Sequence, residues 1–186
     1  MPRVVTGEFR GTILNAPKGD NTRPTTDKVK EAVFSMIQMR VPECSFLDIF
    51  SGTGQMGIEA VSRGAVEAVM IERSGAAAGI IKENLQKIHC GEDPRFRLIK
   101  AHYDKALEVL GQEGKKFDII FLDPPYREAH KDMVRIAGLI RQYGLLSEGG
   151  IVLCEHSSDL PFDTDVINLK FIRSCSYGLT VITFFE

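Results

Sequence analysis

Residues 117–126 read Phe-Asp-Ile-Ile-Phe-Leu-Asp-Pro-Pro-Tyr, an apolar run that ends in an acid, two prolines and an aromatic ring. A short, continuous apolar run before a turn indicates a strand that is buried on both faces, as in a parallel sheet. In open α/β sheets, ligands bind just outside the carboxyl ends of the strands. We therefore expect residues 123–126 to lie in a functional site, although an Asp-Pro turn at the end of a strand is also common.

The chemistry of this tetrapeptide suits a flat ligand that carries an exocyclic amine. The ring of Tyr126 can stack on a nucleobase. The carboxylate of Asp123 and the backbone carbonyl of Pro124 can accept hydrogen bonds from the two N–H groups of the amine. Because short motifs also occur by chance, the interpretation depends on the residues around this strand.

Elsewhere the chain alternates short apolar runs with helical patterns. The strands that we expect are 45–50, 65–71, 95–101, 117–122 and 150–155, and the helices are 54–63, 75–88, 103–110 and 129–143. This alternation is typical of βαβ units, and it predicts an α/β fold with a parallel sheet covered by helices on both faces. Two last runs, 166–173 and 177–185, have no helix between them and predict an antiparallel hairpin at the edge of the sheet.

The N-terminal residues have a pattern of their own. Short β-like runs at 4–6 and 12–14 predict a small hairpin. Residues 25–27 offer N-caps for a helix whose apolar positions include Val29, Val33 and Ile37, and we expect Pro42 to end that helix. We therefore divide the chain into an arm, residues 1–26, and a main domain, residues 27–186.

Length and composition indicate one globular domain. The chain has 186 residues, of which 44% are hydrophobic and 26% charged. No apolar run is long enough to span a bilayer, and the N-terminus has no apolar signal segment, so we expect a cytoplasmic protein. Its four cysteines have no metal-ligand spacing, and we expect reduced thiols and no metal.

The charge of the chain gives little information about its partner. The net charge is −2, which does not by itself indicate nucleic acid. Residues 1–40 carry seven basic and four acidic side chains. This local excess is small, and considered alone it favours an ordinary solvated surface over contact with phosphates.

A glycine-rich turn follows the first expected strand. Gly52, Gly54 and Gly57 fit the G-x-G-x-x-G pattern, and Glu72 lies 20 residues after Gly52, where an acid can bind ribose hydroxyls. Asp48 precedes these glycines at the carboxyl end of the strand. Its charge would repel a pyrophosphate at the helix N-terminus, and it suits a cationic ligand without phosphate, such as S-adenosylmethionine. A capping role for Asp48 is the alternative.

Other polar residues allow more than one role. His102 and Asp104 follow the third expected strand, and either one could face an adenine, while Asp104 could equally cap the next helix. We expect Asn84 on a helix surface. Glu155 either orients a neighbouring side chain or only ends its strand. The histidines that we expect at the surface or bonded to backbone are His89, His130 and His156.

Together these motifs resemble those of the bacterial 16S ribosomal RNA guanine-N2 methyltransferases. The resemblance covers nearly the whole chain and is specific at the start of the first helix. The proline corner, residues 123–126, matches the catalytic motif of the family. The matching segments are 3–7, 10–11, 23–34, 47–54, 57–60, 62–65, 123–126, 154–156 and 177–180.

The resemblance implies a Rossmann-like, seven-stranded methyltransferase sheet with one reversed strand. It also implies that S-adenosylmethionine donates a methyl group to the N2 amine of a guanine in 16S ribosomal RNA. The donor would be bound by Arg23, Thr25, Asp48, Phe50, Gly52, Gly54, Glu72 and either His102 or Asp104. Catalysis would fall to Asp123, Pro124 and Tyr126, and RNA would be held by Pro125 and by Arg3 and Arg10 of the arm. Many relatives have an aspartate in place of His102, which leaves the adenine contact open.

We expect a monomer that needs no metal and acts on ribosomal RNA within a small-subunit particle. Adenine-N6 methylation of DNA is an alternative, because the tetrapeptide suits amines in general, but a target-recognition insertion is absent after Tyr126. A non-catalytic RNA-binding assembly factor on the same fold is another, and the acids at 48, 72 and 123 argue against it. A nicotinamide dehydrogenase would have no use for Asp48 or for the proline corner.

Overall fold

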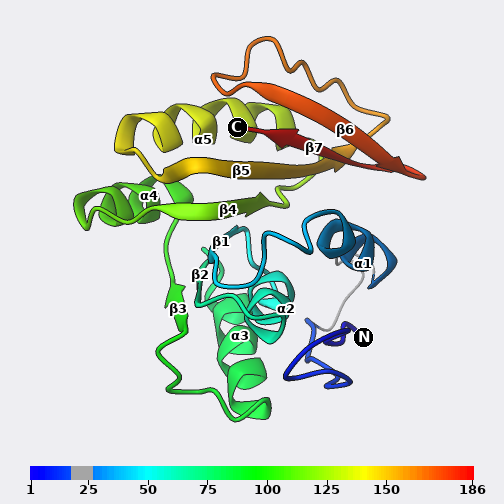
Figure 1. The fold of residues 1–186 in the computed structure, drawn as a ribbon, viewed down its shortest axis with the longest axis vertical. Coiled ribbons are helices and arrows are strands. Elements are labelled where there is room, and N and C mark those ends of the chain that lie inside the picture. Colours follow the sequence, from blue (N-terminus) through cyan, green and yellow to red (C-terminus); the bar gives the residue numbers. More distant parts are fainter. Residues whose placement is uncertain (18–26) are drawn as a thin grey trace.

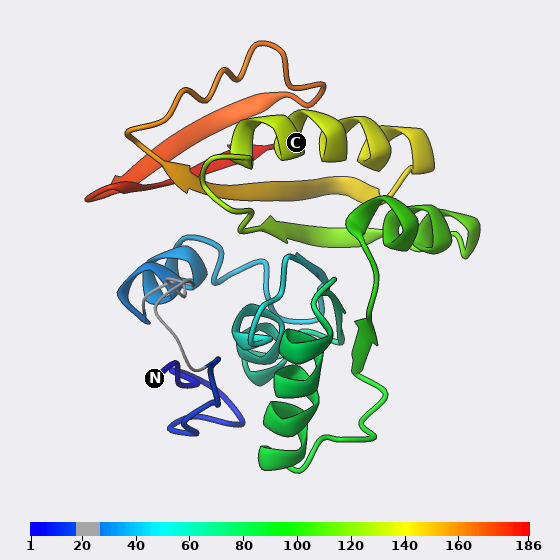
Figure 2. The same cartoon turned by 180° about the vertical axis from the view of Figure 1, so that it is seen from behind.

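A seven-stranded sheet forms the centre of the molecule (Figures 1 and 2). The computed structural model describes residues 1–17 and 27–186. The strands are β1 (Ser45–Ile49), β2 (Glu67–Ile71), β3 (Phe96–Ile99), β4 (Phe117–Leu122), β5 (Leu146–Ser157), β6 (Phe171–Tyr177) and β7 (Thr180–Phe185). The helices are α1 (Asp27–Met36), α2 (Gln55–Ser62), α3 (Gly75–Lys87), α4 (Tyr103–Gln112) and α5 (Ala129–Tyr143).

The strand order β3-β2-β1-β4-β5-β7-β6 places the functional end of the sheet. Strand β1 pairs in parallel with β2 on one side and with β4 on the other, so that Ile49 lies beside both Ile71 and Leu122. The chain order reverses between these neighbours, and such a reversal opens a crevice at the carboxyl ends of the strands. The segments that follow β1, β2 and β4 therefore meet there.

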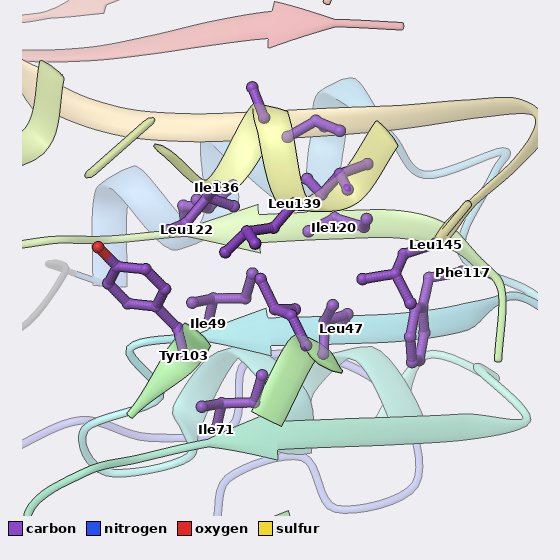
Figure 3. Close-up of a cluster of buried hydrophobic side chains, with 14 of the residues drawn as sticks. Leu47, Ile49, Ile71, Tyr103, Phe117, Ile120, Leu122, Ile136, Leu139 and Leu145 are labelled. Atoms are coloured by element: carbon purple, nitrogen blue, oxygen red, sulfur yellow. The ribbon is translucent and has the colours of Figure 1, made fainter. Parts of the chain in front are cut away.

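Helices cover both faces of the sheet, which explains the continuous apolar runs of the central strands. Side chains of α4 and α5 pack on one face against Leu47, Ile49, Ile120 and Leu122, as Figure 3 shows. The helices α1, α2 and α3 pack on the other face. Within the described part of the chain, no helix has the length and hydropathy that crossing a membrane requires.

The expected α/β fold is confirmed, and the strand at 117–122 and the helix at 129–143 have the predicted bounds. The C-terminal hairpin was placed wrongly. Its first strand is Phe171–Tyr177 and not 166–173, so the polar residues expected in the turn belong to the strand. Strand β6 lies at the edge of the sheet with mostly exposed side chains and therefore needs no apolar pattern. The turn lies at Gly178, whose φ is 63°.

Helix α1 ends earlier than predicted. Its last residue is Met36, six residues before Pro42. A proline disfavours the helical conformation of the residue before it, here Val41. The chain leaves the helix before that point in a turn in which the N–H of Arg40 donates to the carbonyl of Ile37 over 2.8 Å. The N-caps expected at Thr25 and Thr26 lie outside the described residues.

The N-terminal hairpin is much less regular than predicted. Its two sides share one antiparallel bridge, between Arg3 and Ile13. The N–H groups of Val5 and Thr6 instead donate to the buried carboxylate of Glu59 in α2, over 2.8 and 3.0 Å. Val4 and Leu14 are buried among side chains of α2 and α3. The described part of the arm thus packs closely on the main domain.

Gly7 lies where the arm crosses the end of α2. Its φ is 89°, and a Cβ added there would lie 1.6 Å from the carbonyl oxygen of Ser62. Gly11 has nearly the same φ, 87°, but a Cβ there would meet nothing within 4 Å. We expect Gly7→Ala to lower the free energy of unfolding by about 2 kcal/mol, because strain and a backbone clash combine. Gly11→Ala is the matched control for backbone strain alone. If urea unfolding showed that both variants lose the same free energy of unfolding, the clash at Gly7 would be refuted.

Candidate active site

A cavity of about 850 Å³ opens at the carboxyl ends of β1, β2, β3 and β4. Its lining includes these predicted residues: Asp48, Phe50, Gly52, Glu72, His102, Asp123, Pro124, Pro125 and Tyr126. Arg3, Arg10, Gly54 and Asp104 are not among its lining residues. Arg23 and Thr25 lie outside the described part of the chain.

The glycine turn after β1 has an unusual backbone. Phe50, Gly52 and Gly54 all have positive φ, at 71°, 54° and 77°. Phe50 is strained there, as residues at binding sites often are. Gly52 lines the cavity, and a Cβ added there would lie 3.9 Å from the carbonyl oxygen of Phe50, its nearest described atom outside the adjoining residues. The absence of a side chain at Gly52 therefore leaves room for a ligand.

Asp48 is the most deeply buried acid in the described lining of the cavity, with an exposure of 1%. Its Oδ2 accepts a hydrogen bond of 3.2 Å from the N–H of Gly57 in α2, so the capping role is present as well. Burial raises the pKa of Asp48 to about 7, and the charge of Glu72 adds to this effect while the Gly57 hydrogen bond opposes it. A buried carboxyl with such a pKa is ready to pair with a cation.

Glu72 holds the glycine turn from the neighbouring strand. Its Oε2 accepts from the N–H of Gly52 over 2.9 Å, and its Oε1 accepts from the N–H of Ser74 over 2.7 Å. Each carboxylate oxygen can accept more than one hydrogen bond. Glu72 can therefore fix the turn and also accept hydroxyl groups of a ligand in the cavity.

Aromatic side chains form the opposite wall. Tyr103 contacts His102 and Phe50, with ring centroids 4.2 and 5.5 Å away. Its hydroxyl donates to Oδ1 of the buried Asp132 over 2.8 Å, and burial together with this carboxylate raises the pKa of Tyr103. Figure 3 shows the Tyr103 hydroxyl pointing away from the other labelled side chains. Sequence reasoning missed Tyr103 and Asp132, both of which line the cavity.

The structure distinguishes between the two candidates for the adenine contact, His102 and Asp104. His102 lines the cavity. Asp104 is half-buried beside it, where Oδ1 accepts from Nε of Arg135 over 3.0 Å. The backbone N–H of Asp104 lies 3.4 Å from Nδ1 of His102, which caps α4. The geometry therefore favours His102, together with Tyr103, over Asp104.

The proline corner is held by strands that lie far away in sequence. The hydroxyl of Tyr126 donates to Oε1 of Glu155 over 3.0 Å and lies 3.2 Å from Oγ1 of Thr180. Burial, with the negative charge of Glu155 adding to it, raises the pKa of Tyr126 to about 12, so this hydroxyl stays protonated. Glu155 is 2% exposed. Of its two suggested roles, the structure therefore favours the orientation of a neighbour.

Tyr126→Phe removes the hydroxyl and keeps the ring. A hydrogen bond to a charged group contributes about 1.5–3 kcal/mol, so partial loss of ring orientation would lower turnover about tenfold. The measurement is the steady-state rate of the methyl transfer to RNA that the sequence resemblance implies. Tyr177→Phe is the matched control, because the Tyr177 hydroxyl donates to Sδ of Met36 and not to a site residue. A Tyr126→Phe protein with unchanged turnover would mean that Glu155 does not orient the ring for catalysis.

Several smaller expectations are settled by the structure. Asn84 does not lie on a helix surface: its side chain is fully buried, because α3 turns it towards the arm and the glycine turn. His130 and His156 each lie within hydrogen-bonding distance of a backbone carbonyl, as expected, and His89 is exposed. Arg3 is paired with Asp27 on the α1 side, with 3.2 Å between Nε and Oδ2.

The electrostatics of the cavity favour a cation. Its described lining includes five carboxyl groups, those of Asp48, Glu72, Asp123, Glu128 and Asp132, against one guanidinium, that of Arg73. Such a lining would repel a ligand with a pyrophosphate. Among residues 1–17 and 27–186, no three His, Cys, Asp or Glu side chains are grouped to hold a metal ion.

The doubly wound sheet, with its antiparallel β7 between β5 and β6 and its acid-lined crevice, defines a Rossmann-like methyltransferase fold. The family model described as Conserved hypothetical protein 95 matches residues 2–186, and the chain belongs to this family. The names of curated relatives, together with this match, confirm the resemblance to the family of 16S ribosomal RNA methyltransferases.

Relatives and a solved structure agree with this assignment. The chain is 34% identical over 184 residues to the putative rRNA methyltransferase YlbH of Bacillus subtilis, covering 99% of this chain and 98% of that protein. It is 31% identical over 153 residues to ribosomal RNA small subunit methyltransferase D of Escherichia coli K12, covering 82% of this chain and 73% of that protein. The structure of the putative methyltransferase yhhF from Escherichia coli matches with a TM-score of 0.79 at 28% identity, covering 98% of this chain and 96% of that one.

Proposed function

We propose that this protein transfers a methyl group from S-adenosylmethionine to the exocyclic N2 amine of a guanine in 16S ribosomal RNA. The observation that carries the proposal is that Asp48 and Glu72 line the same cavity as Asp123 and Tyr126. A site for a sugar-linked cation and a site for an aromatic amine are thereby adjacent. The names of the relatives, which describe rRNA methyltransferases, support the coarser part of the proposal.

The residues of the cavity fit this donor. Asp48 offers a buried carboxyl to a ligand that carries a sulfonium and an ammonium. Glu72 can accept the two ribose hydroxyls. The aromatic wall of Phe50, His102 and Tyr103 suits a purine ring. The roles of Arg23 and Thr25 in binding the donor remain predictions, because these residues lie outside the described ranges.

When bound, S-adenosylmethionine supplies an electrophilic methyl carbon. The protein's own contribution lies in how it treats the acceptor amine, whose lone pair is delocalised into the base. Asp123 and the carbonyl of Pro124 would accept its two N–H bonds and favour a tetrahedral nitrogen. These bonds strengthen as positive charge develops on the nitrogen, so they stabilise the transition state more than the bound substrate. Asp123 or water then takes the proton.

The acceptor must reach this corner as an unstacked base. Tyr126 would stack on its face, and the exposed Pro125 lies next to it on the surface. A guanine within a helix can be presented in this way only after it flips out. Arg3 and Arg10 of the arm, residues 1–26, are proposed as contacts to the surrounding RNA, and both are exposed.

We further propose that the substrate is an assembled small-subunit particle. The net charge of −2 gives weak attraction to naked RNA, so part of the docking would come from other components of the particle. A monomer in the cytoplasm, where such particles assemble in bacteria, is consistent with this substrate and remains a prediction.

The test is to incubate the protein with isotope-labelled S-adenosylmethionine and ribosomal RNA from a strain that lacks the corresponding gene. The RNA is offered both naked and as small-subunit particles, and the product is mapped by mass spectrometry. The expected result is one N2-methylguanine in 16S RNA, formed faster in particles. A methyl group on adenine, on DNA or on the large-subunit RNA would overturn the assigned acceptor, and no transfer to any of them would favour an assembly factor.

A further inference from the structure

The side chain of Asn84 joins the N-terminal arm to the glycine turn. Its Oδ1 accepts from the backbone N–H of Asn15 over 2.7 Å, and its Nδ2 donates to the carbonyl of Asn15 over 3.1 Å. The same Nδ2 donates to the carbonyl of Thr53 over 2.9 Å. Asn84 is completely buried, so these three hydrogen bonds satisfy a carboxamide that has no access to water.

The bond to Thr53 fixes one peptide plane of the glycine turn from both sides. While the Thr53 carbonyl accepts from Asn84, the N–H of the same peptide, that of Gly54, donates to the carbonyl of Ser51 over 2.7 Å. The peptide between Ser51 and Gly52, two peptides earlier in the turn, is held by Glu72, which accepts from the N–H of Gly52. The turn that lines the cavity therefore depends on two residues outside it, Glu72 and Asn84.

The bonds to Asn15 fix this part of the arm at the mouth of the cavity. The side chain of Asn15 adds two bonds to the outer face of α3, at 3.0 Å to Oε2 of Glu83 and 3.2 Å to Nζ of Lys87. The next two residues, Ala16 and Pro17, line the cavity. One wall of the cavity is thus built from the arm, and Asn84 sets its place relative to the glycine turn.

We propose that Asn84 is a positioning residue for the methyl donor, which holds the arm wall and the glycine turn in the relative arrangement that the donor requires. This inference rests on the proposed function, because it assumes that S-adenosylmethionine occupies the cavity. Its consequence is a reciprocal coupling: loss of the Asn84 bonds weakens donor binding, and donor binding stabilises the bonds to Asn15.

Asn84→Asp tests the proposal with almost no change of volume. The carboxylate can still accept from the N–H of Asn15, but it has no hydrogen for the carbonyls of Thr53 and Asn15. We expect the dissociation constant of S-adenosylmethionine, measured by calorimetry without RNA, to rise about tenfold. The matched control is Ser62→Ala, which removes another buried bridge to the arm, the 2.6 Å bond from Oγ to the carbonyl of Thr6, away from the cavity. Its dissociation constant should stay within about twofold of the wild-type value.

A merely stabilising Asn84 would give another result. Asn84→Asp and Ser62→Ala would then lower the unfolding temperature while both kept wild-type donor affinity, and this outcome would overturn the inference. A wild-type protein that does not bind S-adenosylmethionine would instead overturn the proposed function, and the inference with it. The two failures are therefore distinguishable in one titration series.

A second measurement uses the wild-type protein alone and so does not depend on how the variants fold. Amide hydrogen exchange at Asn15 reports the bond to Asn84. Exchange at Glu8, whose N–H donates to the carbonyl of Ser62, reports the contact of the arm with the end of α2. Saturating S-adenosylmethionine should slow exchange at Asn15 about tenfold more than at Glu8. Equal slowing at both positions would indicate global stabilisation only and would contradict the coupling.

Discussion

Asp123→Ala is expected to lower the turnover number for methyl transfer by about two to three orders of magnitude, the loss typical of a group that stabilises developing charge. Its affinity for S-adenosylmethionine should change little. The reason is positional: Asp123 follows β4 at the proline corner, whereas the acids proposed to face the donor lie at other strands. Asp48 is the penultimate residue of β1, and Glu72 follows β2. The measurements are single-turnover methyl transfer to particles and calorimetry with the donor.

A matched variant separates hydrogen bonding from charge. Asp123→Asn keeps an oxygen that can accept one N–H bond but removes the negative charge and the proton acceptor. We expect its turnover to lie between those of wild type and Asp123→Ala. If Asp123→Ala lost turnover and donor affinity equally, Asp123 would be assigned to donor binding and not to the chemical step. If its turnover equalled that of the wild type, the assigned role would be refuted.

The central strands were predictable because their burial imposes an apolar pattern that can be seen in each short stretch of the sequence. A strand covered on both faces is apolar along most of its length, and β4 therefore appears in the sequence with its correct bounds. The edge strand β6 is subject to no such requirement. Its polar residues are exposed, so the pattern could not distinguish strand from turn. The prediction of a regular hairpin in the arm failed for a related reason, because the N–H groups of Val5 and Thr6 bond to Glu59 and not to the facing side of the hairpin.

Site residues could be predicted where a single sequence motif contains them. They could not be predicted where segments distant in the sequence come together. Asp48, Glu72 and Asp123 each lie within one residue of the carboxyl end of a strand, so the parallel sheet alone brings them together. The contact of Tyr126 with Glu155 and Thr180 joins three elements, which no local spacing reveals.

Asn84 and Asp132 did leave a signal in the sequence. Asn84 lies on the same helical stripe as Ile81 and Leu85, and Asp132 adjoins Met133 on the buried face of α5. A polar residue within an apolar stripe must find a buried partner, and such residues are candidates for a site.

Asp48→Asn should weaken binding of S-adenosylmethionine by about a hundredfold, because a charge pair at close range near a protein surface contributes a few kcal/mol. The affinity of the wild-type protein should also depend on pH. The pKa of Asp48 in the empty cavity is about 7, so below that value a proton competes with the cationic ligand. We expect wild-type affinity to fall about tenfold for each pH unit below 7, and the variant to lose this dependence.

The same variant should make the empty protein more stable at alkaline pH. A carboxyl whose pKa is higher in the folded protein than in the unfolded chain favours folding when protonated, and that advantage is lost as the pH rises from about 4 through about 7. Asparagine carries no charge and can still accept from the N–H of Gly57. We therefore expect Asp48→Asn to gain roughly 2–4 kcal/mol over wild type at pH 8 in urea unfolding.

At pH 4 this difference between Asp48→Asn and wild type should nearly vanish, because the wild-type carboxyl is then protonated in the folded protein. A stabilised protein that no longer binds its donor would mean that the fold tolerates a buried charge for the sake of its ligand. The contrary result is a variant that loses donor affinity without gaining stability at pH 8. In that case groups within the empty cavity already compensate the charge of Asp48, and its role would be to organise the glycine turn through Gly57 and not to neutralise a cation.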